Sequence, residues 1–219
     1  MPARPEDRIR NWRDCRLFIR ADYHSRSGRR PLFEFFFNPV ARFLVLMRVL
    51  EWSQNTRAPF VLRAPLTFWF RRLSTRLGFS ISLHVFGPGV SLPHYGNIMI
   101  HQDCCFGRNC RIHVGAAIAG SAVIMDPSEV PEFDAPHFGD NVYFGPGVKM
   151  SGPMRIADNI VIGANSVVTR SFTQPGVTIS GFPAKIVALK GSDDMLVRGC
   201  DRVPELARRD AEPAALAAE

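Results

Sequence analysis

The sequence predicts a mainly β protein, a parallel β-helix of hexapeptide repeats with an α-helical region before it. The first observation is that residues 138–169 divide into blocks of six, each opened by a large apolar residue: Phe138, Phe144, Met150, Ile156, Ile162 and Val168. The second is that the same period recurs upstream, with the openers Phe86, Leu92, Ile98, Phe106, Ile112 and Ile118. An α-helix repeats about every 3.6 residues and a half-buried strand every two, so neither gives this period. A parallel β-helix gives a period of six, because each of its coils is made of three hexapeptides.

The fifth place of each block is the third observation. It is apolar or small throughout residues 138–169: Val142, Val148, Met154, Ile160 and Ser166. Openers and fifth places are therefore expected to stack from coil to coil inside the solenoid. The Gly, Asn and Asp residues after the openers suit tight corners that need a positive φ. Ordinary short strands joined by turns are the alternative interpretation, but five consecutive blocks in register argue against it.

The register of the repeat breaks twice. Two extra residues follow Ile98, and residues 121–137 show no repeat. Insertions in a solenoid form loops on one face, often the binding face. We therefore expect a β-helix over 79–190 that carries a functional inserted loop at 121–137.

Residues 1–78 are predicted to form a basic α-helical region. Asn38 followed by Pro39 is typical of a helix start, with an N-cap residue and a proline at the first helical position. A further helix is predicted to begin at Pro65 and to end at Gly78. The apolar stretches of this region are interrupted by charged residues, so no membrane span is predicted. The polar, arginine-dense start of the chain does not resemble a signal peptide.

The charge of the chain is concentrated at one end. Residues 1–80 hold 16 arginines and 6 acidic residues, whereas the rest of the chain is net acidic. The simplest interpretation is a solvated face of amphipathic helices, decorated by Arg42, Arg48, Arg71, Arg72 and Arg76. Peripheral contact with an anionic membrane is a second interpretation. Nucleic-acid binding is not predicted, because no motif for it is present.

The cysteines and the end of the chain complete the prediction. Five cysteines form no CxxC pair, which indicates reduced thiols, a cytoplasmic location and no metal site. The inner face of the membrane is an alternative location. Residues 191–219 are poor in large apolar residues, so a tail is predicted that either forms a short helix from about Pro204 or is mobile.

Several segments carry a resemblance to a known family: FGPGVSLPHYGNIMIH (86–101), FGRNCRIHVGAAIAG (106–120), HFGDNVYFGPGVKMSG (137–152), IADNIVIGANSVVT (156–169) and GFPAKIV (181–187). The chain resembles the serine-acetyltransferase-like branch of the hexapeptide acyltransferases, which includes polysaccharide O-acetyltransferases. The resemblance implies a left-handed β-helix, an exception to the usual crossover rule. It also implies a homotrimer or a dimer of trimers, with acetyl-CoA bound between neighbouring solenoids as the cosubstrate.

By this resemblance His94 is the catalytic base and His137 the second active-site histidine, contributed across the subunit boundary. An imidazole that titrates near neutrality can take the proton of an attacking hydroxyl and return it to the departing thiolate. The resemblance further implies contacts with coenzyme A or the acceptor by Gly145, Gly163, Ala164, Lys185, Tyr95 and Asp134. The other histidines are expected to be structural: His24, His84, His101 and His113.

Three positions depart from the pattern of true serine acetyltransferases. Phe79 stands where the resemblance expects the Asp that orients the catalytic histidine, and Pro93 replaces a second Asp. Pro136 stands where it expects the Arg that grips the carboxylate of serine. Other acids that could orient His94 are Asp103, Asp126, Glu129, Glu132 and Asp134. The main hypothesis is therefore acetyl transfer to a sugar hydroxyl, with serine O-acetylation and a non-catalytic binding solenoid as alternatives.

Overall fold

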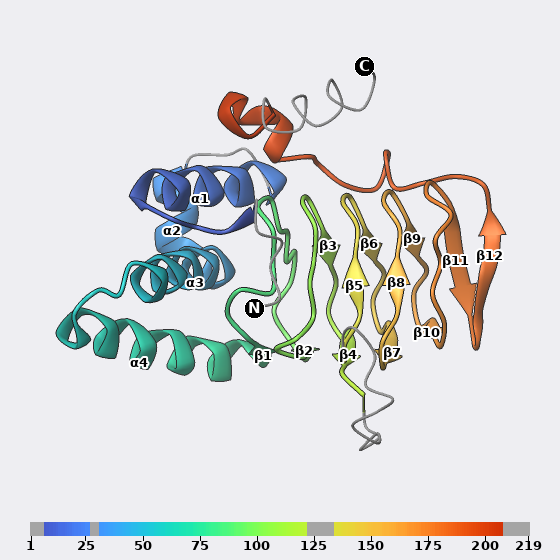
Figure 1. The fold of residues 1–219 in the computed structure, drawn as a ribbon, viewed down its shortest axis with the longest axis horizontal. Coiled ribbons are helices and arrows are strands. Elements are labelled where there is room, and N and C mark those ends of the chain that lie inside the picture. The colour runs from blue at the N-terminus through green and yellow to red at the C-terminus, as the bar shows by residue number, and fades with distance from the viewer. Residues whose placement is uncertain (1–6, 27–30, 122–133, 208–219) are drawn as a thin grey trace.

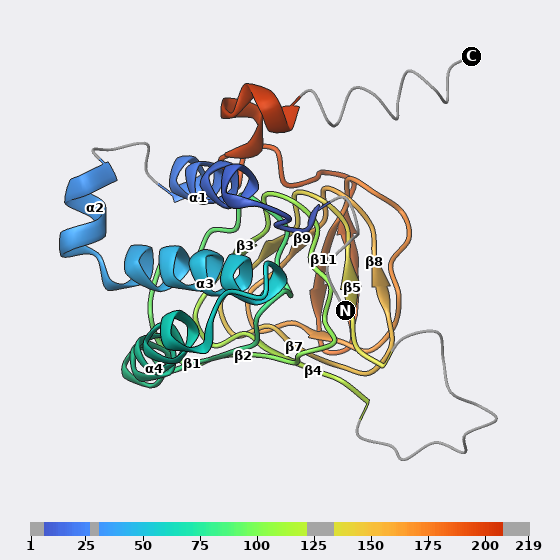
Figure 2. The same cartoon turned by 60° about the vertical axis from the view of Figure 1, so that its left-hand side comes forward.

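The computed structural model describes residues 7–26, 31–121 and 134–207. Four helices lead into a solenoid of short strands, and α4 extends away from its first coil (Figure 1; Figure 2). The helices are α1 (Trp12–Arg26), α2 (Pro31–Phe37), α3 (Pro39–Asn55) and α4 (Phe60–Leu77). Among the described residues, no helix is both long and apolar enough to span a membrane.

The strands form three sheets, which we call the first, second and third faces of the solenoid in the order that the chain visits them. The first face is β1 (Phe79–Ile81), β2 (Ile98–Ile100), β4 (Ala117–Ala119), β7 (Lys149–Ser151) and β10 (Val167–Val168). The second is β5 (His137–Phe138) and β8 (Arg155–Ile156), extended by bridges such as Phe86–Phe106. The third is β3 (Arg111–Ile112), β6 (Tyr143–Phe144), β9 (Val161–Ile162) and β11 (Thr178–Gly181), with β12 (Ala184–Ala188) antiparallel at its end.

The core confirms the hexapeptide prediction. Every predicted opener is at most 4% exposed, and the fifth places from Val142 to Ser166 are equally buried. At one corner Asn109, Asn141 and Asn159 take φ values of 55°, 57° and 57°. Their side chains form a ladder, in which Nδ2 of one donates to Oδ1 of the next at 3.0 Å in both steps. The predicted parallel β-helix after a helical region is therefore correct.

The helix boundaries agree with the sequence in one case and differ in another. Oδ1 of Asn38 accepts from the backbone N–H of Val40 at 3.0 Å, so α3 is capped as predicted. Gly78 ends α4 as predicted, with a φ of 71°. However, α4 begins at Phe60 and not at Pro65, which lies inside it. Pro65 is solvent-exposed, and the helix tolerates the loss of one backbone hydrogen bond there.

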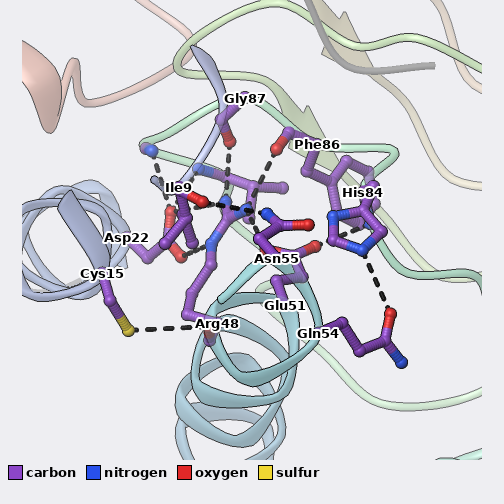
Figure 3. A network of polar contacts seen from close by, with 12 residues as sticks. Ile9, Cys15, Asp22, Arg48, Glu51, Gln54, Asn55, His84, Phe86 and Gly87 are labelled. Carbon is purple, nitrogen blue, oxygen red and sulfur yellow. Dashed lines mark hydrogen bonds and ion pairs between the residues drawn. The ribbon is translucent and has the colours of Figure 1, made fainter. Parts of the chain in front are cut away.

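A buried ionic network joins the helices to the first coil (Figure 3). Arg48 is predicted on a solvated face, but its side chain is 1% exposed. Its Nε donates to Oδ2 of Asp22 at 2.8 Å, and one Nη donates to Oε2 of Glu51 at 3.1 Å. The two Nη atoms also donate to the carbonyls of Phe86 at 2.9 Å and Gly87 at 2.7 Å. Arg48 therefore binds backbone acceptors of a coil that no earlier coil can cover.

The two carboxylates satisfy backbone donors of the same coil. Oδ1 of Asp22 accepts from the N–H groups of Gly89 at 2.8 Å and Val90 at 3.0 Å. Oε1 of Glu51 accepts from the N–H of His84 at 2.7 Å. Although desolvation opposes it, the charges of Asp22 and Glu51 raise the pKa of the Arg48 guanidinium. The network thus caps the open end of the solenoid with one guanidinium and two carboxylates, which are hydrogen-bonded to one another and to the backbone of the coil.

The chain after β12 runs back along the solenoid to the helices (Figure 1). On its way Ser192 donates its N–H to the carbonyl of Asn159 at 3.2 Å, and Cys200 donates its N–H to Oδ1 of Asn109 at 3.0 Å. After η2 (Cys200–Arg202), residues 204–207 are helical, one of the two alternatives that the sequence left open. Three buried residues of this segment pack on α1: Cys200, Val203 and Leu206. The boundaries 1–78, 79–190 and 191–219 remain a prediction.

Candidate active site

His94 lies at the corner where the third face turns into the first. The backbone of this corner stacks from coil to coil: the N–H of Gly115 donates to the carbonyl of Asn97 at 2.7 Å. The N–H of Gly147 donates to Val114 at 3.0 Å, and the stack continues to the last coils. We call this continuous corner the His94 edge; it comprises residues 93–97, 113–116, 145–147 and 163–165. The side chain of His94 is exposed on it, and that of Tyr95 lies exposed beside it.

His113 is the nearest aromatic neighbour of His94. The two ring centroids lie 6.1 Å apart, and the His113 ring is 5.2 Å from that of Tyr143. Nε2 of His113 accepts from Nε of Arg111 at 3.3 Å. Desolvation by burial, followed by the charges of Arg111 and His94, lowers the pKa of His113. The contact with Arg111 therefore places a neutral imidazole, with its proton on Nδ1, beside His94.

The sequence interpretation of His113 as a structural residue missed this neighbour. Its position carried a usable signal, because His94 and His113 follow the openers Leu92 and Ile112 by two residues and one residue. Consecutive coils bring such positions to the same edge. The repeat alone could therefore have placed the two histidines together.

The residues predicted to meet coenzyme A also follow the His94 edge. The N–H groups of Gly145 and Gly163 donate to the carbonyls of the next coil, each at 2.8 Å, so neither is available to a ligand. A Cβ on Gly145 would lie 2.7 Å from the nitrogen of Ala164, and one on Gly163 would lie 2.6 Å from Oγ of Ser180. Coil stacking therefore requires both glycines whatever binds outside. Ala164 and Lys185 are exposed, the lysine on β12 at the far end of the solenoid.

His137 and Asp134 lie elsewhere in the chain. His137 is in β5 on the second face and pairs with Cys105 and Arg155 of the neighbouring coils. A cavity of about 430 Å³ opens beside these three residues. Asp134 is exposed just before β5, and its carbonyl accepts from the N–H of Ser121 at 2.7 Å. Within one chain the fold does not bring His137 or Asp134 to the His94 edge.

None of the described acids predicted to orient His94 forms an ion pair with it. Phe79 is 5% exposed and packs in the core with its ring centroid 5.0 Å from that of Phe43. Oδ2 of Asp103 lies 3.5 Å from Nδ1 of His101, and in the described residues Asp103 forms no ion pair with His94. The loop acids Asp126, Glu129 and Glu132 lie outside the described residues. In the described part of the chain His94 forms no ion pair with a carboxylate, and His113 is the side chain beside its ring.

Known proteins that resemble the chain in sequence are serine acetyltransferases. The enzyme of Synechococcus elongatus is 27% identical over 181 residues, which are 81% of this chain and 68% of the relative. That of Mycobacterium tuberculosis is 27% identical over 143 residues, 64% of this chain and 57% of the relative. That of Staphylococcus epidermidis is 31% identical over 105 residues, 48% of this chain and 46% of the relative. No family model matches the chain.

Solved structures give the same result for the fold. Serine acetyltransferase from Neisseria gonorrhoeae superimposes with a TM-score of 0.63 at 24% identity, covering 81% of this chain and 67% of that one. The enzyme from Brucella abortus in complex with coenzyme A gives 0.57 at 22% identity over 81% and 67% of the two chains. At these identities the likeness shows the fold, a helical region followed by a β-solenoid. Sequence and fold agree: the chain is distantly similar to the serine acetyltransferases and shares their helical region followed by a β-solenoid.

Proposed function

We propose that the protein is an acetyl-CoA-dependent O-acetyltransferase in which His94 is the general base. The observation that carries the proposal is the exposed imidazole of His94 on an edge that continues along the glycine corners to Lys185. The edge lies in a chain whose relatives are named serine acetyltransferases. One related structure, from Brucella abortus, is a complex with coenzyme A.

The chemistry follows from the protonation of one imidazole. Neutral His94 takes the hydroxyl proton of the acceptor while the hydroxyl oxygen attacks the thioester carbonyl of acetyl-CoA. The new C–O bond gives a tetrahedral oxyanion, whose negative charge requires a hydrogen-bond donor other than the glycine N–H groups that stack the coils. The C–S bond then breaks, and the imidazolium returns the proton to the leaving thiolate. The transfer is direct and forms no acyl-enzyme.

The comparisons favour an amino-acid acceptor, serine or a close relative, over the saccharide that the sequence analysis placed first. The relatives are named for serine, and one related structure, from Neisseria gonorrhoeae, is a complex with serine. A saccharide hydroxyl is the second candidate. Its support is Pro136, which stands where the family resemblance expects the arginine that holds the serine carboxylate.

Thiol release from acetyl-CoA tests the function and separates the two acceptors. We expect turnover with L-serine or homoserine, and the panel also holds nucleotide sugars and simple glycosides. Turnover with a sugar alone would replace the amino-acid acceptor by a saccharide. Coenzyme A binding is measured in parallel by calorimetry. A protein that binds no coenzyme A would be a non-catalytic solenoid, and the proposed function would be wrong.

We further propose that the working site lies between subunits of a homotrimer. Within one chain His94 and His137 lie on different parts of the solenoid, so a site that uses both needs two subunits. Two inactive variants, His94→Ala and His137→Ala, should then complement each other when mixed chains are refolded together. In random one-to-one trimers about a quarter of the interfaces keep both histidines, so about 25% of the wild-type activity is expected. Activity is followed by thiol release, and molar mass by light scattering.

The control replaces the His137→Ala chain by the doubly substituted chain His94→Ala/His137→Ala. Its mixtures with His94→Ala contain no intact pair and should stay inactive. If mixed trimers of the two single variants are no more active than the mean of their parents, His137 does not serve the site of a neighbouring subunit. If His137→Ala alone keeps full activity, this histidine has no part in the reaction.

A further inference from the structure

The outward side of α4 has an unusual composition. None of the 18 residues of the helix is acidic, and three of its four arginines are exposed: Arg71, Arg72 and Arg76. The fourth, Arg63, is partly buried on the side that faces the core. Four large apolar side chains on the same helix are 56–83% exposed: Phe60, Val61, Phe68 and Trp69. A helix that only packed on a protein core would bury such side chains, since their exposure to water is unfavourable.

The apolar and basic side chains share one side of the helix. Val61, Phe68, Arg72 and Arg76 recur at intervals of four or seven residues, so they follow one another along a single stripe. The opposite side holds the two buried residues of α4 and faces α3, where the ring of Phe70 stacks on that of another phenylalanine at 5.2 Å. The stripe is therefore a free surface of the described structure.

A groove of about 810 Å³ runs along this surface. Phe60 and Phe68 line it together with the four arginines. In the part of the chain that the structure describes, none of these arginines forms an ion pair. Guanidinium groups beside an open groove are suited to bind phosphate oxygens through paired hydrogen bonds.

The charge of the stripe decides between partners. A second copy that docked the same face in a two-fold contact would set arginines against arginines with no acidic residue on either side. An anionic lipid surface instead matches both features, because it attracts basic side chains and admits aromatic ones at its interface. We propose that the exposed side of α4 docks on the surface of a bilayer that contains anionic phospholipids.

Docking would orient the rest of the molecule. The N–H of Gly96, two residues from His94, donates to the carbonyl of Leu77 at the end of α4 at 2.8 Å. The His94 edge therefore begins where the docking helix ends. A docked enzyme would hold that edge close to the bilayer, and this consequence, unlike docking itself, rests on the proposed function.

Vesicle co-sedimentation of the full chain tests the docking. We expect the protein to bind vesicles of phosphatidylcholine with phosphatidylglycerol, and not vesicles of phosphatidylcholine alone. The triple variant Arg71→Gln/Arg72→Gln/Arg76→Gln should lower the partition coefficient by about 100-fold, since each arginine near an anionic surface contributes about fivefold. Phe68→Ser/Trp69→Ser should weaken binding to the same vesicles, with the fold checked by circular dichroism.

The matched control removes three exposed arginines from other places: Arg13→Gln/Arg16→Gln/Arg170→Gln. Its net charge equals that of the α4 variant, so equal losses of binding would show general electrostatic attraction and overturn the proposal. Equal binding to neutral vesicles would overturn it as well. The wild type could bind no vesicles while the α4 variants differ from it in molar mass in solution. That result would overturn the proposal and show that this face of α4 joins copies of the chain. An intact acetyl-transfer activity in those samples would leave the proposed function standing.

Discussion

Replacing His94 by alanine is expected to lower kcat for acetyl transfer by about 10²–10⁴-fold, the usual contribution of a general base. The hydroxyl of the acceptor is a weak nucleophile at neutral pH, and His113 is the other imidazole of the His94 edge. His113 accepts from Arg111 through Nε2, so this nitrogen is already engaged. Steady-state kinetics with acetyl-CoA and the best acceptor of the panel measure the effect.

The His94 side chain is exposed, so its removal should leave the fold intact. The melting temperature and coenzyme A affinity of His94→Ala are therefore expected to match those of the wild type. His24→Ala, a histidine of α1, is the matched control and should keep kcat within about twofold, as surface substitutions usually do. A His94→Ala protein with wild-type kcat would show that the reaction uses another base.

Replacing Arg48 by methionine is expected to lower the free energy of unfolding by about 3–5 kcal/mol, because it leaves the carboxylates of Asp22 and Glu51 buried without their counter-ion. It also frees the carbonyls of Phe86 and Gly87 from their side-chain donor. Urea unfolding followed by circular dichroism measures the change.

Arg42→Met on the same helix is the control, since its side chain is exposed and its loss should change stability by less than about 0.5 kcal/mol. The triple variant Arg48→Met/Asp22→Asn/Glu51→Gln removes all three charges and keeps the shapes of the two acidic side chains. It should recover part of the lost stability, since no charge is then buried alone. If the triple variant is less stable than Arg48→Met, the loss does not come from unpaired charge.

The sequence predicted what depends on residues close together in the chain. The six-residue spacing of Phe138, Phe144 and Met150 determines the coil, and asparagines at fixed offsets determine its corners. The start of α3 follows from the single pair Asn38–Pro39, because a cap is a local contact. These features can be predicted without knowing which residues pack against them from other parts of the chain.

Contacts between distant residues could not be predicted in the same way. Arg48 looks like any other arginine of a basic helical region, and its burial depends on Asp22 and on the backbone of a coil 38 residues away. The distance between His94 and His137 likewise depends on the face of the solenoid to which each residue belongs: His94 lies at the corner between the third and first faces, and His137 lies on the second. The inserted loop 121–137 lies mostly outside the described residues, so its predicted role remains a prediction.

The packing of Cys200, Val203 and Leu206 on α1 imposes an order on assembly (Figure 2). Cys15, Leu17 and Phe18 of α1 leave the ribosome long before Cys200, Val203 and Leu206, because the whole solenoid lies between them in the chain. The coils can stack one by one as they emerge, since each needs only its predecessor. During this time α3 can cover part of the apolar side of α1 through Val49 and Trp52, but the part that contacts Cys200, Val203 and Leu206 stays uncovered. Docking of residues 200–206 on α1 is therefore expected only after the coils between them have been synthesised, and a nascent chain that stalls within the solenoid leaves this part of α1 without its cover.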